Sequence, residues 1–333
     1  MAGVKNSKLK LLYLAEILEK KTDENNYISA TALCDELAEL GIQAERKSIY
    51  NDIDVLREYG YDIIHNGSRN SGGYFMGERK FQLAEIRLLI DAVQAANFIS
   101  PKKTNEIIEK IESFISEKQA KTMRSQIYMD NRPKCKNDEL YYTINNLYEA
   151  IIKGVKVNFV YTRRKITDEF KTVKEDKTFT VSPYALIWSE DHYYLICNNE
   201  KYDNLMNLRI DRIKKVTVTN KKARHFSEVS EYKNYFDSAD YANKLFNMYS
   251  GEPKPIELIC ENDLLETMLD RFGENVKIQK SDDDHFVIKT NAIVSDGLAA
   301  WVLAFGGRVK IKSPNDLIYS VKMKAEEILK NYQ

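Results

Sequence analysis

The sequence predicts an α+β protein built of several small domains, and three observations carry that prediction. The chain has 333 residues, which is more than one domain of the usual ~100–200 residues holds. Hydrophobic residues make up 43% and charged residues 30%, a balance typical of globular proteins. Apolar residues recur at helical spacing in some stretches and at strand spacing in others, which favours an α+β multidomain fold.

Composition limits the classes of function. Lys+Arg and Asp+Glu are both 50, so net charge neither favours nor excludes nucleic-acid binding. No apolar run reaches the ~18–20 residues of a membrane span, and residues 1–5 lack the apolar core of a signal peptide. The four cysteines are scattered without a CxxC pair, which argues against a zinc site and a disulfide framework. We therefore expect a cytoplasmic protein with no metal, no cofactor and no membrane partner.

Residues 1–80 predict a winged helix-turn-helix. Apolar residues at helical spacing predict three helices, over 8–21, 30–40 and 45–59. Ser29 stands at the N-cap of the second helix, and Gly41 and Gly60 end the second and third. Two short strands flanking a polar, glycine-rich tip are expected at 61–65 and 73–76. Two helices joined by a tight turn and followed by a wing form a DNA-binding unit.

The third helix and the wing carry side chains suited to DNA, because such a helix meets base edges near its N-terminus. The candidate DNA contacts on the helix are Arg46, Lys47, Ser48, Tyr50, Asn51 and Arg57. Those on the wing are Asn66, Ser68, Arg69 and Asn70. Up to Lys80 the chain has 11 basic and 13 acidic residues, so a helix face that is only solvated is the alternative.

Residues 81–153 predict a helical connector. Two apolar stripes at helical spacing occupy 83–115, and Ser100-Pro101 between them signals a new helix start. A further helix is expected over 142–153. The stripes either join two chains in a homodimer or pack only within their own chain.

Residues 154–224 predict a small all-strand domain. Alternating apolar residues indicate strands at 156–161 and 177–181, two more within 182–197, and further strands at 207–213 and 216–218. In the stretch 207–213, Leu208, Ile210 and Arg212 are expected on one face. A sheet of this size is best closed into a small barrel.

This sheet can display tyrosines and arginines side by side, which suits a base and a phosphate. Aromatic stacking on a base contributes about 1–3 kcal/mol, and arginine holds phosphate bidentately. The candidate effector-binding residues are Ser182, Tyr184, Tyr193, Asn207, Arg209, Arg212 and Arg271. In the alternative, Tyr193 belongs to the core, and the strand arginines pair with Asp211 or Glu190.

Residues 225–333 predict a linker and an α/β module that begins at about residue 256. The expected strands are 256–260, 276–279, 285–290 and 308–311, and the expected helices are 263–272 and 296–305. Their order, β-α-β-β-α-β, is the ferredoxin-like, split-βαβ pattern. A last helix runs to Tyr332.

The chain resembles the WYL-domain transcriptional regulators of bacteria. The family's Trp-Tyr-Leu stands here as Tyr-Tyr-Leu at residues 193–195, and its arginine-rich strand as residues 208–213. Its Thr-Ile-x-Arg-Asp in the recognition helix stands as Ser-Ile-Tyr-Asn-Asp at residues 48–52, with Asn in place of Arg. Winged helix, WYL domain and C-terminal extension (WCX) follow in the family's order. The resemblance implies an Sm-like, SH3-type small β-barrel over 154–224.

The resemblance also implies a function, that of a ligand-responsive transcriptional regulator. The partners it implies are a double-stranded DNA operator, a nucleic-acid or nucleotide effector at the WYL domain, and a second copy in a homodimer. We expect a repressor, because nothing in the sequence marks a surface that contacts RNA polymerase.

Two rival functions stay open. One is a nucleotide- or nucleic-acid-processing enzyme with an accessory DNA-binding head, and the other is an interaction module that does not bind DNA. An enzyme needs a carboxylate cluster or a nucleophile–base pair, and the one dense acidic run, 282–284, falls between expected strands. The sequence has no Walker A motif, nucleophile elbow or metal-ligand cluster, so we expect no enzyme.

Overall fold

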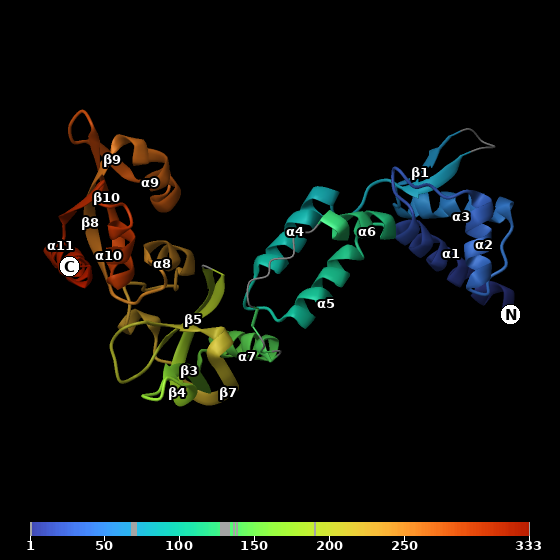
Figure 1. Cartoon of the computed structure of the whole chain (residues 1–333). Helices are drawn as coiled ribbons and strands as arrows, with labels where there is room; N and C mark the ends of the chain where they lie inside the picture. The colour runs from blue at the N-terminus through green and yellow to red at the C-terminus, as the bar shows by residue number, and fades with distance from the viewer. Residues whose placement is uncertain are drawn as a thin grey trace. The chain divides into compact units, whose positions relative to one another are not determined.

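A boundary after residue 136 divides the chain into two units, Met1–Lys136 and Asn137–Gln333 (Figure 1). The computed structural model describes residues 2–67, 72–126, 134–135, 137, 139–189 and 191–332, without the side chains of 2–7 and 126. Within these residues no helix has the length and apolar content that a membrane crossing requires. Each unit is described by itself.

The first unit begins with three helices and two strands. They are α1 (Ala2–Lys21), α2 (Ala30–Glu39), α3 (Arg46–Tyr59), β1 (Ile63–Asn66) and β2 (Gly73–Met76). Ser29 caps α2 as the sequence predicts, its hydroxyl accepting a hydrogen bond from the amide of Ala32 at 3.2 Å. Gly60 ends α3 with a φ of 117°, in the left-handed region that favours glycine. Helix, helix, helix and antiparallel wing follow in the expected order.

The three helices share one apolar core. Its fully buried side chains include Leu14, Leu18, Leu33, Leu37, Ile49 and Ile53. Val55, expected on the apolar side of α3, is instead 47% exposed. It lies two positions beyond Ile53, and two residues rotate about 200° around a helix, so it faces away from the core. Ile28 and Tyr74 exchange two backbone hydrogen bonds, which fix the wing to the loop between α1 and α2.

Three further helices complete the first unit. They are α4 (Leu83–Ala95), α5 (Pro101–Glu112) and α6 (Glu117–Gln126). Ser100 caps α5, and Pro101 occupies its first turn, where a missing amide hydrogen costs nothing. The buried side chains shared by these helices are Ile86, Ile90, Ile108, Ile115 and Met123. The inner stripe of α4 therefore packs within its own chain.

A buried carboxylate ties the winged helix to these three helices. Asp23, in the loop after α1, is 1% exposed, and it accepts hydrogen bonds from the Ser116 hydroxyl and from the Asn26 amide. Burial acts to raise the pKa of Asp23, but the bonds from Ser116 and Asn26 act against it and the pKa ends below its ordinary value. Arg79 reaches the same loop, where it donates to the carbonyl of Thr22.

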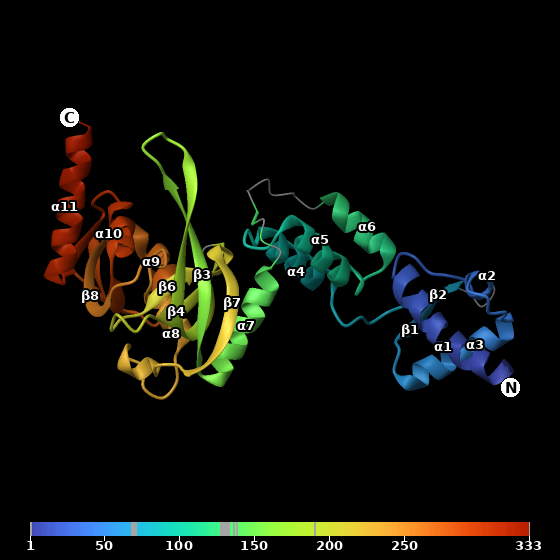
Figure 2. The ribbon, with the colours of Figure 1, turned by 90° about the horizontal axis from the view of Figure 1, so that it is seen from below.

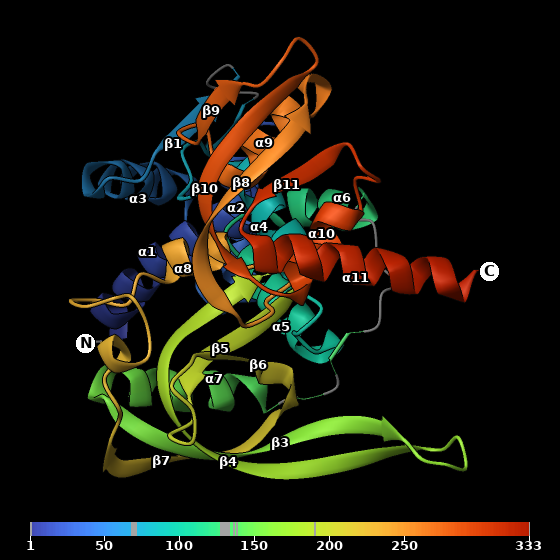
Figure 3. The same cartoon turned by 90° about the vertical axis from the view of Figure 1, so that its left-hand side faces the viewer.

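The second unit opens with α7 (Leu140–Lys153) and a five-stranded antiparallel sheet (Figure 3). The strands are β3 (Val155–Ile166), β4 (Thr172–Ser189), β5 (His192–Asn198), β6 (Met206–Arg209) and β7 (Ile213–Lys222). They pair in the order β6-β5-β4-β3-β7. Helix α7, which the sequence assigns to the connector, packs against β7, β4 and β3, with Leu147 and Ala150 fully buried.

Two of the expected strands differ from the observed ones. β4 is one 18-residue strand where the sequence predicts two, and its register shifts between Pro183 and Ala185. Pro183 has no amide hydrogen to give to the ladder, which is why proline favours such irregular positions. The expected strand 207–213 is broken, because residues Ile210–Arg212 form a 3-10 helix, η1. One such turn stacks positions i and i+3, and both Ile210 and Ile213 are fully buried.

The rest of the second unit is a linker and an α/β module (Figure 1). The linker holds η2 (Phe226–Glu228) and α8 (Ser238–Lys244). The module holds β8 (Glu252–Glu261), η3 (Asn262–Leu264), α9 (Leu265–Phe272), β9 (Lys277–Lys280), β10 (His285–Val294), α10 (Asp296–Leu303), β11 (Val309–Ser313) and α11 (Asn315–Asn331). Its strands pair in the order β11-β8-β10-β9, with every neighbour antiparallel. The element order is the one expected for a ferredoxin-like module.

The linker packs on both the five-stranded sheet and the module. One buried cluster unites Ile187, Tyr194 and Ile196 of the sheet, Val229, Tyr241, Leu245 and Met248 of the linker, and Ile293 of β10. The sheet and the module are therefore joined through an apolar contact and not only through the chain.

Candidate nucleic-acid interface and effector site

The beginning of α3 presents basic and polar side chains to solvent. Arg46, Lys47 and Asn51 are exposed. Tyr50 is half-buried, with its ring centroid 6.3 Å from that of Tyr74 in the wing. Nη2 of Arg46 donates a hydrogen bond to the Tyr50 hydroxyl at 3.1 Å. The contact lays the Arg46 side chain along the helix, so a cation and an aromatic hydroxyl lie together next to the wing.

Two other candidate DNA contacts on α3 hold the domain together. Ser48 accepts a hydrogen bond from Lys10 of α1, and Lys10 also pairs with Asp52 at 2.7 Å. Nε of Arg57 donates to the carbonyl of Ile63 at 2.8 Å, which joins α3 to β1. The surface that α3 offers to a ligand is therefore narrower than the sequence predicts, and it centres on Arg46, Lys47, Tyr50 and Asn51.

The wing adds Asn66, which ends β1 and is exposed. The other three candidates of the wing, Ser68, Arg69 and Asn70, lie outside the described residues. Tyr74 of β2 was not singled out in the sequence, yet its ring contacts Tyr50 and lies 5.9 Å from the Arg57 guanidinium. No local pattern distinguishes it from other strand tyrosines, because its role depends on how the wing folds back onto α3.

The strand register separates Tyr193 from Arg209. Tyr194, not Tyr193, stands opposite Arg209 in the β5–β6 pair, and Tyr193 stands opposite Trp188 in the β4–β5 pair. Neighbouring residues of a strand point to opposite faces, so Tyr194 and Arg209 share one face while Tyr193 and Trp188 share the other. The interpretation that placed Tyr193 and Arg209 on one ligand surface is therefore corrected.

Arg209 is engaged in an ion pair. Its Nε donates to Oδ1 of Asp211 at 3.0 Å and its Nη2 to Oδ2 at 2.7 Å. These hydrogen bonds raise the pKa of Arg209. The two guanidinium nitrogens that would hold a phosphate bidentately are thus bound to the Asp211 carboxylate. This ion pair is the alternative that the sequence indicated for Arg209. Arg212, in η1, is exposed and does not share the strand face of Leu208.

A histidine completes the face that carries Arg209. The ring of His192 lies 6.2 Å from that of Tyr194. Burial, and then the positive charge of Arg209, lowers the pKa of His192, so the ring is neutral at neutral pH. Its Nδ1 is buried and has no hydrogen-bond partner among the described residues. No local pattern singles out His192, because strand pairing is what brings Tyr194 and Arg209 to it.

Asn207 links β6 to the linker. Its Nδ2 donates to the carbonyl of Met248 at 3.0 Å, and its Oδ1 accepts from the hydroxyl of Tyr241 at 3.1 Å. Burial raises the pKa of Tyr241 to about 12, so this hydroxyl keeps its proton and donates. The amide that was expected to read an effector thus has a structural role.

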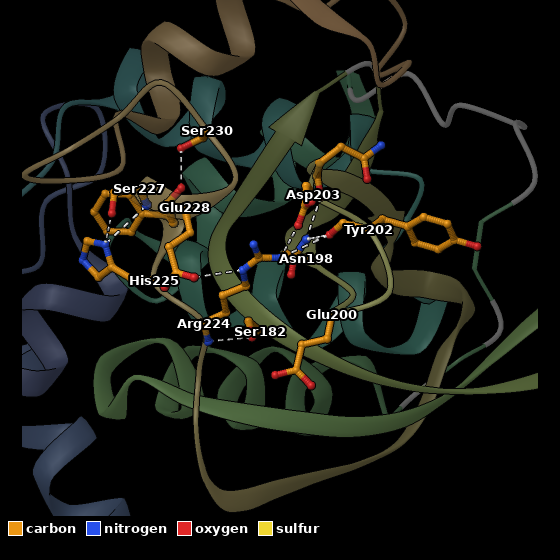
Figure 4. A network of polar contacts seen from close by, with 12 residues as sticks. Ser182, Asn198, Glu200, Tyr202, Asp203, Arg224, His225, Ser227, Glu228 and Ser230 are labelled. Carbon is orange, nitrogen blue, oxygen red and sulfur yellow. Dashed lines mark hydrogen bonds and ion pairs between the residues drawn. The ribbon is translucent and has the colours of Figure 1, made fainter.

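Ser182 belongs to a polar network around Arg224 (Figure 4), and Tyr184 contacts Arg224 as well. The Arg224 amide donates to the Ser182 hydroxyl at 2.9 Å, and the Tyr184 hydroxyl donates to the Arg224 carbonyl at 3.0 Å. Burial raises the pKa of Tyr184. The Arg224 guanidinium pairs with Asp203 at 2.8 Å and with Glu228 at 3.1 Å. These two candidates therefore fasten the start of the linker to the sheet.

Arg271 lines a pocket of about 430 Å³ between the β4–β5 hairpin, the linker and the C-terminal module. The lining residues are Trp188, Ser189, Ala242, Asn243, Leu245, Phe246, Asn247, Arg271 and Trp301. The Arg271 guanidinium carbon lies 4.0 Å from the Phe246 ring centroid, and Nη2 donates to the Leu245 carbonyl at 2.6 Å. Two indole rings beside a guanidinium suit a planar base with an anionic group.

The pocket also shows which candidates meet and which do not. Arg271 and Trp188 come together from α9 and β4, whereas Asn207 and Arg209 do not line this pocket and have partners of their own. Trp188 and Trp301, which line the pocket with Arg271, were not among the predicted site residues. A tryptophan at a strand end has no sequence signal that separates a core ring from a pocket ring, and Trp188 is 51% exposed.

Comparisons with known families match both halves of the second unit. The WYL domain model matches residues 142–218, and the WCX domain model matches residues 255–329. The WYL match begins within α7 and ends within β7, and the WCX match covers β8 to α11 except for the ends. No curated protein matches the chain.

Two solved structures are similar at low identity. The chain of proteasome accessory factor B/C (PafBC) of Arthrobacter aurescens is 13% identical, with a TM-score of 0.28, over 94% of this chain and 45% of that one. A CRISPR Cas-related protein is 13% identical, with a TM-score of 0.38, over 75% of this chain and 72% of that one. This chain thus spans less than half the length of the PafBC chain. Both TM-scores are low, so the function of neither protein is transferred to this chain.

Proposed function

Because this chain is a WYL-domain protein with a WCX domain after the WYL domain, we propose that it is a ligand-responsive, DNA-binding transcriptional regulator. In this proposal the first unit reads a double-stranded operator and the second unit binds a nucleotide or nucleic-acid effector. The effector acts by binding two states of the protein with different affinity. A repressor is the simpler form, since it needs no surface for RNA polymerase. No catalytic step is part of the proposal.

The observation that carries the DNA-binding half is the exposed polar start of α3 beside the wing. Helices of this class enter the major groove with their N-terminal residues against base edges. Here that end of the helix offers Arg46, Lys47 and Asn51, with Tyr50 hydrogen-bonded to Arg46. Arginine reads guanine bidentately and asparagine reads adenine, so these types can give sequence preference as well as affinity.

Substitutions on α3 test this half. An operator is first selected from a random duplex library with the full chain. Arg46→Ala and Asn51→Ala are expected to weaken operator binding by about 1–3 kcal/mol each and to relax base preference. Fluorescence anisotropy at a fixed salt concentration measures both. Lys20→Ala is the control for the loss of a positive charge, because Lys20 lies in the last turn of α1 and pairs with Glu16 one turn earlier.

The control should bind the operator like the unsubstituted chain. If Arg46→Ala and Asn51→Ala also bind like it, with unchanged thermal unfolding, then α3 is not the recognition helix. Loss of binding in Lys20→Ala to the same degree would instead indicate a general effect of charge.

The effector half of the proposal centres on the tryptophan pocket with Arg271. Stacking on Trp188 and Trp301 and a charge-assisted contact to Arg271 would hold a base and its phosphate. The pocket is bordered by the β4–β5 hairpin, the linker and the module, so a ligand there would bias how these three parts pack. That is the kind of differential contact a ligand needs in order to shift a population.

A homodimer is also part of the proposal. The inner stripe of α4 packs in the first unit, but the helix also exposes Leu83, Leu88 and Leu89 at 45%, 70% and 41%, with Leu88 on the outer side, opposite the buried Ile86 and Ile90. An exposed leucine on the outer side of a helix suits contact with a second apolar surface. We assign this outer side to contact with a second copy, which would present two recognition helices to a two-fold operator.

A further inference from the structure

One arm of the second unit has no part in the function proposed so far. Figure 2 and Figure 3 show β3 and β4 running past the rest of the sheet as a two-stranded ribbon. β7 pairs with β3 only as far as Tyr161, and β5 pairs with β4 only from Ser182 onward, whereas β3 and β4 stay paired out to Ile166 and Thr172. Residues 163–178 are exposed, with Thr167 at the tip half-buried. The ribbon therefore offers two open faces.

One face of the ribbon has its charges engaged. Side chains of Arg163 and Lys165 lie on this face with Glu175, because alternate residues of a strand share a face. The Arg163 guanidinium lies 5.6 Å from the Tyr161 ring centroid, and Lys165 pairs with Glu175 at 2.7 Å. Cations on this face thus have partners within the ribbon or at its base.

The opposite face sets two cations directly against each other. Arg164 stands opposite Lys174 in the β3–β4 register. Side chains so placed begin about 4.5–5.5 Å apart, and like charges there destabilise the pair. Neither has an ion-pair or hydrogen-bond partner among the described residues. The carboxylate on the same face, Asp176, accepts a hydrogen bond from the Thr162 hydroxyl at 2.7 Å and pairs with neither cation.

We propose that Arg164 and Lys174 bind the phosphate backbone of double-stranded DNA. A phosphate between the two cations removes their repulsion and gives each a charge-assisted hydrogen bond. A two-stranded β-ribbon has the width that the major groove of B-DNA admits, and the duplex supplies closely spaced phosphates along both edges of that groove. The site is open on a ribbon and not enclosed, which suits a polyanion better than one small phosphate ester.

The arm makes this contact without the help of α3. It contributes affinity and not base preference, because phosphate contacts carry no sequence information directly. The proposal therefore concerns binding to duplexes of any sequence. It can be tested independently of the role assigned to Arg46 and Asn51.

Paired variants of the full chain test the arm. Arg164→Ala with Lys174→Ala removes one arginine and one lysine from the proposed face. Arg163→Ala with Lys165→Ala removes the same types and the same charge from the other face of the same ribbon. Binding to a random-sequence duplex is measured by anisotropy over a series of salt concentrations. The first variant should lower the slope of log K against log salt by about 1.8, which is two phosphate contacts at 0.9 each. The second should leave the slope unchanged.

The outcomes separate the arm from the recognition helix. Equal slope changes in both double variants would reduce the effect to net charge and overturn the proposal, and so would no change in either. Each double variant is then combined with Arg46→Ala. The duplex binding that remains in the Arg46→Ala chain should weaken further with Arg164→Ala and Lys174→Ala, and should not change with Arg163→Ala and Lys165→Ala. If Arg46→Ala by itself abolishes all duplex binding, the arm does not bind DNA on its own and the proposal fails, while the role of α3 stands. If the tip residues Ile166 and Phe170 serve a protein partner instead, duplex binding is the same in every arm variant.

Discussion

At the scale of single residues, five arginines of the described part of the chain fall into two kinds. Arg57, Arg209 and Arg224 are bound to carbonyl or carboxylate oxygens that fold the chain. Arg46 and Arg212 are exposed. The sequence predicted Arg57 and Arg209, like Arg46 and Arg212, as contacts to DNA or an effector because arginine suits phosphate, but the partners of Arg57 and Arg209 depend on register and on loops. For Arg209 the competing partner, Asp211, was visible two residues away, and the structure selects it.

Arg209 and Arg212 therefore predict opposite results on substitution. Arg209→Ala removes a bidentate pair and leaves Asp211, which is 16% exposed at its side chain, without its cation. The expected loss is about 1.5–3 kcal/mol of unfolding free energy, the range for hydrogen bonds to charged groups. Arg212→Ala is an exposed substitution and should change stability by less than about 0.5 kcal/mol. Urea unfolding of the two variants checks both values. Equal midpoints for the two variants would contradict the structural role of Arg209.

Asp23 predicts an acid-sensitive contact within the first unit. Its folded-state pKa lies below the ordinary value, so its contribution is complete above the unfolded pKa, near 3.9, and is lost as pH falls through the lower folded pKa. Asp23→Asn should remove about 1–3 kcal/mol at neutral pH, since Ser116 and Asn26 would lose their charged acceptor. The difference between the two chains should shrink below about pH 4. A pH series of thermal unfolding curves measures it, and a difference that stays constant down to pH 2 would show that the charge of Asp23 does not matter.

At the scale of elements, periodicity predicted most helices and strands to within a few residues. Caps and glycine stops were reliable, as Ser29, Ser100 and Gly60 show, because they act through the backbone of their own turn. Errors fell where tertiary contacts decide. Alternation predicted one strand over 207–213, but burying Ile210 and Ile213 together requires a 3-10 turn between β6 and β7. No local rule reveals that choice.

Helix α4 predicts how two copies meet. Leu88→Glu places a charge on the outer side of α4, where Leu88 is 70% exposed in one chain, so the fold should be unaffected. Sedimentation at micromolar concentration should show twice 38.7 kDa for the unsubstituted chain and a monomer for Leu88→Glu. Leu329→Glu on α11, where Leu329 is 62% exposed, is the matched control. A dimer disrupted by the α11 variant alone would move the interface to the C-terminal module.

At the scale of the whole molecule, the candidate effector pocket could not be foreseen. Trp188, Phe246, Arg271 and Trp301 come from four separate elements or segments, and only long-range packing brings them together. The sequence named Arg271 alone of this group. It predicted that the other effector residues share one surface of the sheet. Alternation within a strand can be predicted from sequence, but the pairing between strands that decides which residues meet cannot.

Linkage between the two units predicts a measurable coupling. A nucleotide or single-stranded oligonucleotide that binds the pocket should raise the melting temperature of the folded chain. Trp188→Ala removes an exposed stacking surface and should abolish that rise with little loss of basal stability, whereas Tyr142→Ala, which removes a still more exposed aromatic of α7, should retain it. The same ligand should change operator affinity by a factor of about 5–150, and the operator should change ligand affinity equally. A ligand that stabilises the Trp188→Ala chain as well binds elsewhere.

The boundary after residue 136 bears on whether the first unit could be replaced by a different domain. Each of four apolar clusters of described residues lies wholly within one of the two units. A different DNA-binding domain fused before Asn137 would leave the two apolar clusters of the second unit intact. Under the proposed function, such chimeras would carry the same effector response to a promoter of choice.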